Sequence, residues 1–97
     1  GQSNLKINNY SLNINSRVFS SKNNMLKLTE REIEILLFLK KQKDPININV
    51  LQKEVWGYAE DSETHTVETH VYRLRKKIKK AFGDQNFIQS DKKGYFI

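Results

Sequence analysis

The chain contains the stretch Glu63-Thr-His-Thr-Val-Glu-Thr-His-Val-Tyr-Arg-Leu-Arg-Lys-Lys-Ile-Lys-Lys80, which combines an apolar stripe with a dense run of positive charge. Its apolar residues, Val67, Val71, Leu74 and Ile78, recur at intervals of four, three and four. At roughly 100° per residue, this spacing keeps them within about 60° of arc on one side of an α-helix. The stretch therefore predicts a helix over about residues 65–80 that packs on its own domain through this stripe.

The opposite side of the predicted helix is basic, hydroxylated and aromatic. The same rotation brings six residues to it: His65, Thr69, Tyr72, Arg73, Lys76 and Lys80, with Thr66 and His70 on one flank and Arg75 on the other. A solvated helix face usually mixes both signs of charge, whereas residues 65–80 contain six Lys or Arg and only one acid, Glu68. We therefore expect this face to bind a polyanion. Thr64 or Thr66 is expected to cap the helix.

The composition is typical of one small globular domain over residues 1–97. Of the 97 residues, 37% are hydrophobic, and the formal net charge of +6 favours nucleic acid or another anionic partner. The absence of cysteine excludes disulfide bonds, cysteine-ligated zinc and thiol nucleophiles. No apolar run approaches the roughly 18 residues of a membrane span, so we expect no membrane partner, and the lack of cysteine permits a reducing cytosolic location. Because the chain starts at Gly1, residues 1–3 are expected to be a tag remnant or linker of an excised piece.

The first 28 residues have the pattern of a strand meander. Short apolar bursts separated by Asn and Ser clusters predict three or four strands over residues 4–28. The apolar positions are Leu5 and Ile7, Leu12 and Ile14, Val18, Met25 or Leu26, and Leu28.

Two further helices are predicted between this meander and the basic helix. The capping-box sequence Thr29-Glu-Arg-Glu32 starts a helix that ends before Asp44-Pro45, because the residue ahead of a proline avoids helical torsions. Asn47 can cap a short second helix that runs to Trp56 and is stopped by Gly57. Residues 57–63 then form an acidic loop.

A hairpin is predicted after the basic helix. Phe87–Ser90 and Tyr95–Ile97 have strand character and are joined by Asp91-Lys-Lys-Gly94, in which Gly94 can supply a positive φ. Two helices joined by a turn, the second basic, followed by a hairpin with a lysine-bearing tip, form a winged helix-turn-helix. The predicted fold class is α+β, with an N-terminal antiparallel β-sheet, a three-helix bundle and a C-terminal β-hairpin wing.

Four segments resemble the DNA-binding effector domain of OmpR/PhoB-type response regulators. They are Leu28-Thr-Glu-Arg-Glu-Ile-Glu-Ile-Leu36, Val55-Trp-Gly57, Thr66-Val-Glu-Thr-His-Val-Tyr-Arg-Leu-Arg-Lys-Lys77 and Gly94-Tyr95, in the family's order over almost the whole chain. The resemblance implies sequence-specific binding of double-stranded DNA and transcriptional regulation in the bacterial cytoplasm. It places the third helix in the major groove and the wing, about residues 87–97, near the minor groove.

The resemblance also implies the site residues. Base contacts are expected from Arg73, Thr69 and Tyr72, since a guanidinium can bond guanine O6 and N7 together. Phosphate contacts are expected from His65, Thr66, His70, Arg75, Lys76, Lys92 and Lys93.

Three features depart from the family pattern. His65 replaces a common arginine, Tyr72 stands where arginine is frequent, and the wing between Gln89 and Gly94 is about one residue short, with lysines where an arginine usually enters the minor groove. Because lysine is more strongly hydrated than arginine, we expect this wing to clamp phosphates.

Further partners follow from the same resemblance. The loop with Gly57, Tyr58, Glu60 and Asp61 is expected to meet RNA polymerase, whereas Trp56 is expected in the core, because large aromatics at helix ends usually bury. Homodimers on direct repeats are expected. Most members carry a phosphorylatable receiver domain ahead of the effector domain, which implies a histidine kinase; this chain contains no receiver.

The sequence does not favour a catalytic or metal-binding site. His65 and His70 are five residues apart and diverge by about 140° on a helix, whereas zinc-protease motifs place two histidines four apart on one face. No glycine-rich phosphate loop or paired carboxylates support an enzyme, so we expect no metal, cofactor or catalysis. A protein-interaction module that binds an acidic partner remains the alternative. A membrane-surface helix is disfavoured, because the apolar face lacks Trp and Phe.

Overall fold

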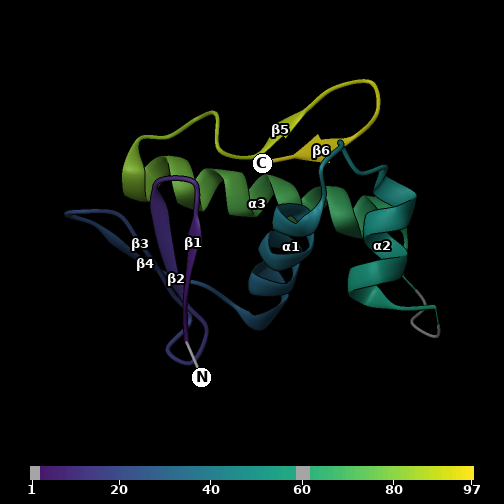
Figure 1. Ribbon diagram of the computed structural model, residues 1–97. Coiled ribbons are helices and arrows are strands. Elements are labelled where there is room, and N and C mark those ends of the chain that lie inside the picture. Colours follow the sequence, from purple (N-terminus) through teal and green to yellow (C-terminus); the bar gives the residue numbers. More distant parts are fainter. Residues whose placement is uncertain (1–2, 59–61) are drawn as a thin grey trace.

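The computed structural model describes residues 3–58 and 62–97, which form two small sheets and three helices. In chain order the elements are β1 (Asn4–Ile7), β2 (Tyr10–Asn13), β3 (Val18–Ser20), β4 (Met25–Lys27), α1 (Glu30–Lys41), α2 (Ile48–Trp56), α3 (Thr64–Phe82), β5 (Gln89–Ser90) and β6 (Tyr95–Phe96). In Figure 1, α3 crosses the molecule with α1 and α2 below it and the β5–β6 hairpin above it. The four-stranded sheet lies toward the C-terminal end of α3. This arrangement confirms the predicted α+β winged helix-turn-helix.

The N-terminal sheet has the order β1-β2-β3-β4 with every neighbouring pair antiparallel, which confirms the predicted meander. Its register aligns Leu5, Leu12, Phe19 and Leu26 in one row across the four strands. Leu12 and Phe19 are fully buried, so this row forms the inner face.

Three of the apolar positions expected in these strands are not core residues. Ile14 is 41% exposed, Met25 is 73% exposed and Val18 is only partly buried, while its neighbour Phe19 is fully buried. The two-residue period of a strand accounts for Val18 and Met25, because it turns them away from the face that holds Phe19 and Leu26. Ile14 lies past the end of β2, which stops at Asn13.

An aromatic cluster joins the sheet to the end of α3. The ring of Tyr10 stacks on Phe19 with centroids 4.7 Å apart and meets Phe82 and Phe87 edge-on at 4.9 and 5.1 Å. Its hydroxyl donates a hydrogen bond to Asp84 Oδ2 at 2.6 Å. Burial, together with the hydrogen bond to Asp84 and its charge, raises the pKa of Tyr10 to about 12.

The predicted starts and ends of α1 and α2 are confirmed. The Thr29 hydroxyl accepts the Glu32 N–H at 3.1 Å, and Glu32 Oε1 accepts the Thr29 N–H at 2.8 Å, which completes the capping box. The Asn47 side chain accepts the Asn49 N–H at 2.8 Å at the start of α2. Gly57, with φ +86°, follows the last residue of α2.

Helix α3 differs from its prediction at both ends. It runs from Thr64 to Phe82, longer than 65–80, and ends at Gly83, whose φ of +72° lies in the left-handed region. The prediction that Thr64 or Thr66 caps it was wrong. Glu63 occupies the cap position, and its backbone carbonyl already accepts the Thr66 N–H at 3.0 Å, so both threonines lie inside the first turn.

The hairpin is shorter than predicted but is held firmly to the helices. Phe87 and Ile88 are buried in the core instead of extending β5. Ile46, in the link between α1 and α2, exchanges backbone hydrogen bonds of 2.7 and 2.9 Å with Tyr95. Gly94, at φ +144°, passes so close to Ile46 that a Cβ there would clash with the Ile46 carbonyl.

Candidate nucleic-acid interface

Helix α3 packs on the core through its predicted row of apolar residues and presents its other side to solvent. Val67, Val71, Leu74 and Ile78 are all buried, which confirms their predicted inward orientation. On the opposite side His65, Tyr72, Arg73, Lys76 and Lys80 are exposed, and Thr69 is half-buried. Tyr72 is 61% exposed, unusual for a large aromatic residue. The outward face therefore combines exposed cations with an exposed aromatic ring.

Two contacts order side chains on this face. The Thr69 hydroxyl donates to the His65 carbonyl at 3.0 Å, within the helix, so its proton is already used. The Lys76 ammonium lies 5.5 Å from the centre of the Tyr72 ring, a cation–π distance.

Two predicted phosphate contacts, Thr66 and His70, lie on a flank of α3 and are half-buried. The imidazole of His70 meets the Trp56 indole edge-on at 5.1 Å, and the guanidinium carbon of Arg31 lies 4.8 Å above the same indole. Trp56 is buried, which confirms that it is a core residue.

Arg75 links the helix to the hairpin, a role that sequence reasoning missed. Its Nε donates to the Ile88 carbonyl at 2.8 Å, and its guanidinium lies 6.0 Å from the centre of the Tyr95 ring. Burial and the charge of Glu68 raise the pKa of Tyr95, and Arg75 opposes that effect. Arg75 therefore has a structural role whatever its remaining N–H groups contact.

The tip of the hairpin is a tight turn built by Asp91. Asp91 Oδ1 accepts the backbone N–H groups of Lys93 at 2.8 Å and Gly94 at 3.2 Å. The side chains of Lys92 and Lys93 are exposed at this tip. The turn therefore presents the ammonium groups of Lys92 and Lys93 on a backbone that packs closely against Ile46 at Gly94.

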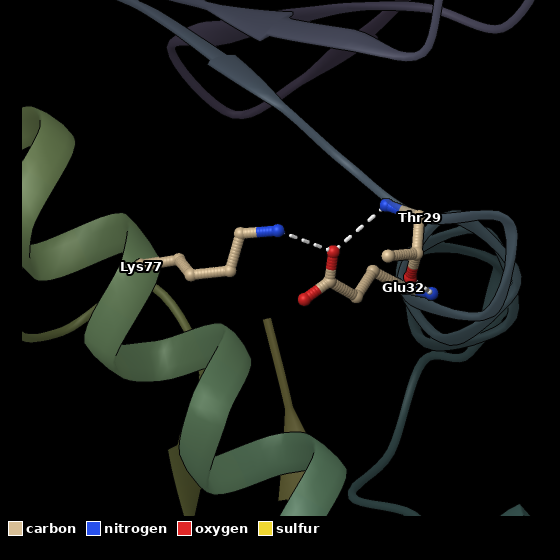
Figure 2. Close-up of polar contacts among 3 residues, drawn as sticks. All are labelled: Thr29, Glu32 and Lys77. Atoms are coloured by element: carbon tan, nitrogen blue, oxygen red, sulfur yellow. Dashed lines mark hydrogen bonds and ion pairs between the residues drawn. The ribbon is translucent and has the colours of Figure 1, made fainter.

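A partly buried ion pair joins α3 to α1, and no sequence pattern beyond the capping box indicates it. Figure 2 shows Lys77 of α3 reaching the carboxylate of Glu32, which also accepts from the Thr29 backbone. The Lys77 Nζ to Glu32 Oε1 distance is 2.7 Å, and Glu32 is only 6% exposed. One carboxylate oxygen thus caps α1 and pairs with the basic helix.

The segment before α3 is described only in part. Gly57 is partly buried, and Tyr58 is 83% exposed, with the Lys53 ammonium 5.8 Å from the centre of its ring. Glu60 and Asp61, expected to meet RNA polymerase, lie outside the described residues.

Over residues 3–58 and 62–97, no group of three or more His, Cys, Asp or Glu side chains is placed to hold a metal ion. Within the same ranges, no helix has the length and apolar character needed to cross a membrane.

Comparison with known proteins gives a family and a fold. Residues 23–97 match the family model described as "Transcriptional regulatory protein, C terminal". The transcriptional regulatory protein DltR of Streptococcus agalactiae is 31% identical over 94 residues, which cover 96% of this chain and 42% of DltR. The chain thus spans about two fifths of the length of that curated relative.

Solved structures share the architecture. The DNA-binding domain of Escherichia coli CadC superposes with a TM-score of 0.84 at 22% identity, covering 99% of this chain and 92% of that domain. The DNA-binding domain of the response regulator AdeR, solved in complex with an intercistronic region, gives a TM-score of 0.77 at 23% identity. The match covers 95% of this chain and 96% of the AdeR domain. At these identities the likeness shows the fold. With the family match over residues 23–97, it follows that this chain belongs to the family of C-terminal domains of transcriptional regulatory proteins, the winged helix-turn-helix domains of OmpR/PhoB-type response regulators.

Proposed function

We propose that this domain binds double-stranded DNA sequence-specifically and regulates transcription as the output domain of a two-component response regulator. The observation that carries the proposal is the outward face of α3, where exposed cations and an exposed tyrosine lie on a helix whose opposite face is fully buried. On this fold, a basic helix beside a basic hairpin suits the major groove and the adjacent backbone. The AdeR domain, which has the same fold, was solved with DNA.

Within this proposal, Arg73 is the main base-reading residue. It is exposed on the outward face, and its planar guanidinium can bond guanine O6 and N7 together. Thr69 would meet a thymine methyl, since its hydroxyl proton is used within the helix. Tyr72 would lie against a base edge beside Lys76.

The remaining cations would hold the DNA backbone without reading sequence. His65, Lys76, Lys92 and Lys93 are exposed and free to reach phosphates. Thr66 and His70 would do so from the flank of α3. Arg75 would contribute only its terminal N–H groups, since its Nε is bonded to Ile88.

The full-length protein is proposed to carry a receiver domain phosphorylated by a histidine kinase, to act in the cytoplasm, and to bind direct repeats as a homodimer. The match to the regulator DltR, of which this chain covers 42%, supports a longer full-length protein. The exposed Tyr58, with Gly57, would form part of a surface for RNA polymerase.

The test is a comparison of two duplexes. A preferred site is first selected from a random DNA pool, and the dissociation constant is measured for that site and a scrambled one. Arg73→Ala should reduce the preference by roughly 5- to 150-fold, the equivalent of about 1–3 kcal/mol for one bidentate base contact. Arg17→Ala is the matched control, because Arg17 lies in the β2–β3 turn and pairs with Glu30 at 3.6 Å.

Each outcome decides a separate point. An equal loss of affinity for both duplexes would make Arg73 a phosphate contact instead of a base contact. No retention of any duplex at micromolar protein and low salt would overturn DNA binding and favour the acidic-protein alternative.

A further inference from the structure

A cationic hollow lies along the C-terminal half of α3 and extends past Lys76, the last residue of this helix expected to touch DNA. It has a volume of about 670 Å³ and is lined by Tyr72, Arg75, Lys76, Lys79, Lys80 and Gln85. Four of these six residues are cations and none is an acid. We call this site the α3 hollow.

The helix dipole does not explain this concentration of charge. Lys79 and Lys80 lie in the last turn of α3, where about half a negative charge from the dipole favours cations. Arg75 and Lys76 lie at least a full turn before Phe82, beyond the reach of that effect. The four cations therefore repel one another across the α3 hollow unless an anion occupies it.

The acid next to the α3 hollow in the sequence is already engaged elsewhere. Asp84 Oδ2 accepts the Tyr10 hydroxyl at 2.6 Å, and Asp84 Oδ1 accepts the Asn86 N–H at 2.9 Å. Both oxygens are thus directed to the sheet and to the turn after α3. Asp84 is therefore not directed at the cations of the α3 hollow.

We infer that the α3 hollow seats backbone phosphates of the same DNA duplex whose bases α3 reads, with Lys79 and Lys80 as phosphate contacts. This inference rests on the proposed function. The α3 hollow is continuous with the outward face, because Tyr72 and Lys76 belong to both. From Tyr72 to Lys80 the helix rises about 12 Å, a length over which one DNA strand carries roughly three phosphates. The occupant that suits both the charge and the length is a run of phosphodiesters.

The experiment measures how affinity depends on salt. Each neutralised phosphate contributes roughly 0.9 to the slope of log K against log salt concentration. Lys79→Gln/Lys80→Gln should therefore lower the magnitude of the slope by about 1–2, for the selected and the scrambled duplex alike. The preference for the selected site should remain, because phosphate contacts carry no sequence information.

A matched control removes the same charge from elsewhere. Lys6→Gln/Lys22→Gln takes two exposed lysines from a polar hollow on the N-terminal sheet, whose inner face packs on the helices, and should leave the slope unchanged. The separate double variant Lys79→Arg/Lys80→Arg keeps both positive charges and should have the wild-type slope. Phosphate ethylation should map the contacts: two or so phosphates flanking the site should interfere with wild-type binding and cease to interfere with Lys79→Gln/Lys80→Gln.

The results separate the inference from the proposed function. A wild-type slope and an unchanged ethylation pattern in Lys79→Gln/Lys80→Gln, with site preference intact, would overturn the inference alone. A slope that falls equally in the Lys6→Gln/Lys22→Gln control would also overturn it, since net charge would then be the cause. If the wild-type domain retained no duplex, the proposed function would fail and the inference with it.

Discussion

Replacing Lys77 by methionine should destabilise the domain by about 2–3 kcal/mol, because the buried Glu32 carboxylate would lose its cation. Lys77 Nζ lies 2.7 Å from Glu32 Oε1, and the two side chains are 34% and 8% exposed. Breaking a fully buried pair costs about 3–5 kcal/mol. The expected loss of about 2–3 kcal/mol is smaller than that, because Lys77 is partly solvated and Glu32 still accepts the Thr29 N–H at 2.8 Å.

The converse change should cost less. Glu32→Gln keeps an oxygen that can accept the Thr29 N–H, and the freed ammonium of Lys77 can reach water, so we expect a loss of about 1 kcal/mol. The double variant should be more stable than the sum of the single losses predicts, by about 1–2 kcal/mol. This asymmetry follows from the unequal burial of the two partners.

The assay is urea unfolding followed by helical circular dichroism at pH 7, extrapolated to water with the slope checked for constancy. For a domain of this size, the loss expected from Lys77→Met corresponds to a fall of roughly 10–20 °C in Tm. Lys80→Met is the control, since Lys80 is exposed on the same helix. A Lys77→Met variant within about 0.5 kcal/mol of Lys80→Met, or strictly additive losses in the double variant, would show that the pair of Lys77 and Glu32 does not stabilise the fold.

Three further predictions concern the hairpin and the aromatic cluster. Gly94→Ala should cost about 2 kcal/mol or more in urea unfolding, because a Cβ would clash with the Ile46 carbonyl; no loss would contradict that contact. Arg75→Met should remove the bond to Ile88 and lower the hydrogen-exchange protection of the Tyr95 amide, whereas Lys76→Met should not. The Tyr10 pKa of about 12 lies above the ordinary 10.0, so folding holds this proton more tightly. The raised pKa stabilises the folded state fully below pH 10, and this contribution is lost as pH rises to about 12. The free energy of unfolding of Tyr10→Phe should therefore fall less than that of the wild type between these pH values. Parallel falls in the two proteins would contradict this prediction.

Features that depend on near neighbours in the chain could be predicted from the amino-acid sequence. The stripe from Val67 to Ile78 required only the helical period, and the structure buries all four of its apolar residues. The capping box at Thr29 and the positive φ of Gly94 are local geometry as well, and both were predicted. Because these signals occur in the order of a winged helix-turn-helix, fold and family could be recognised together.

Tertiary structure alone decided which residues meet across long separations. Arg75 bonds to Ile88, Lys77 pairs with Glu32, and Ile46 pairs with Tyr95, and in each case the partner lies many residues away. Strand register placed Phe19 in the core instead of Val18. The cations that line the α3 hollow come together with Gln85 only because the chain turns back after Gly83. Local sequence patterns indicate which secondary structure a segment forms and which of its faces is apolar. Which residues of distant segments meet depends on how several such faces pack together. The contacts that position α3 could therefore be identified only in the folded domain.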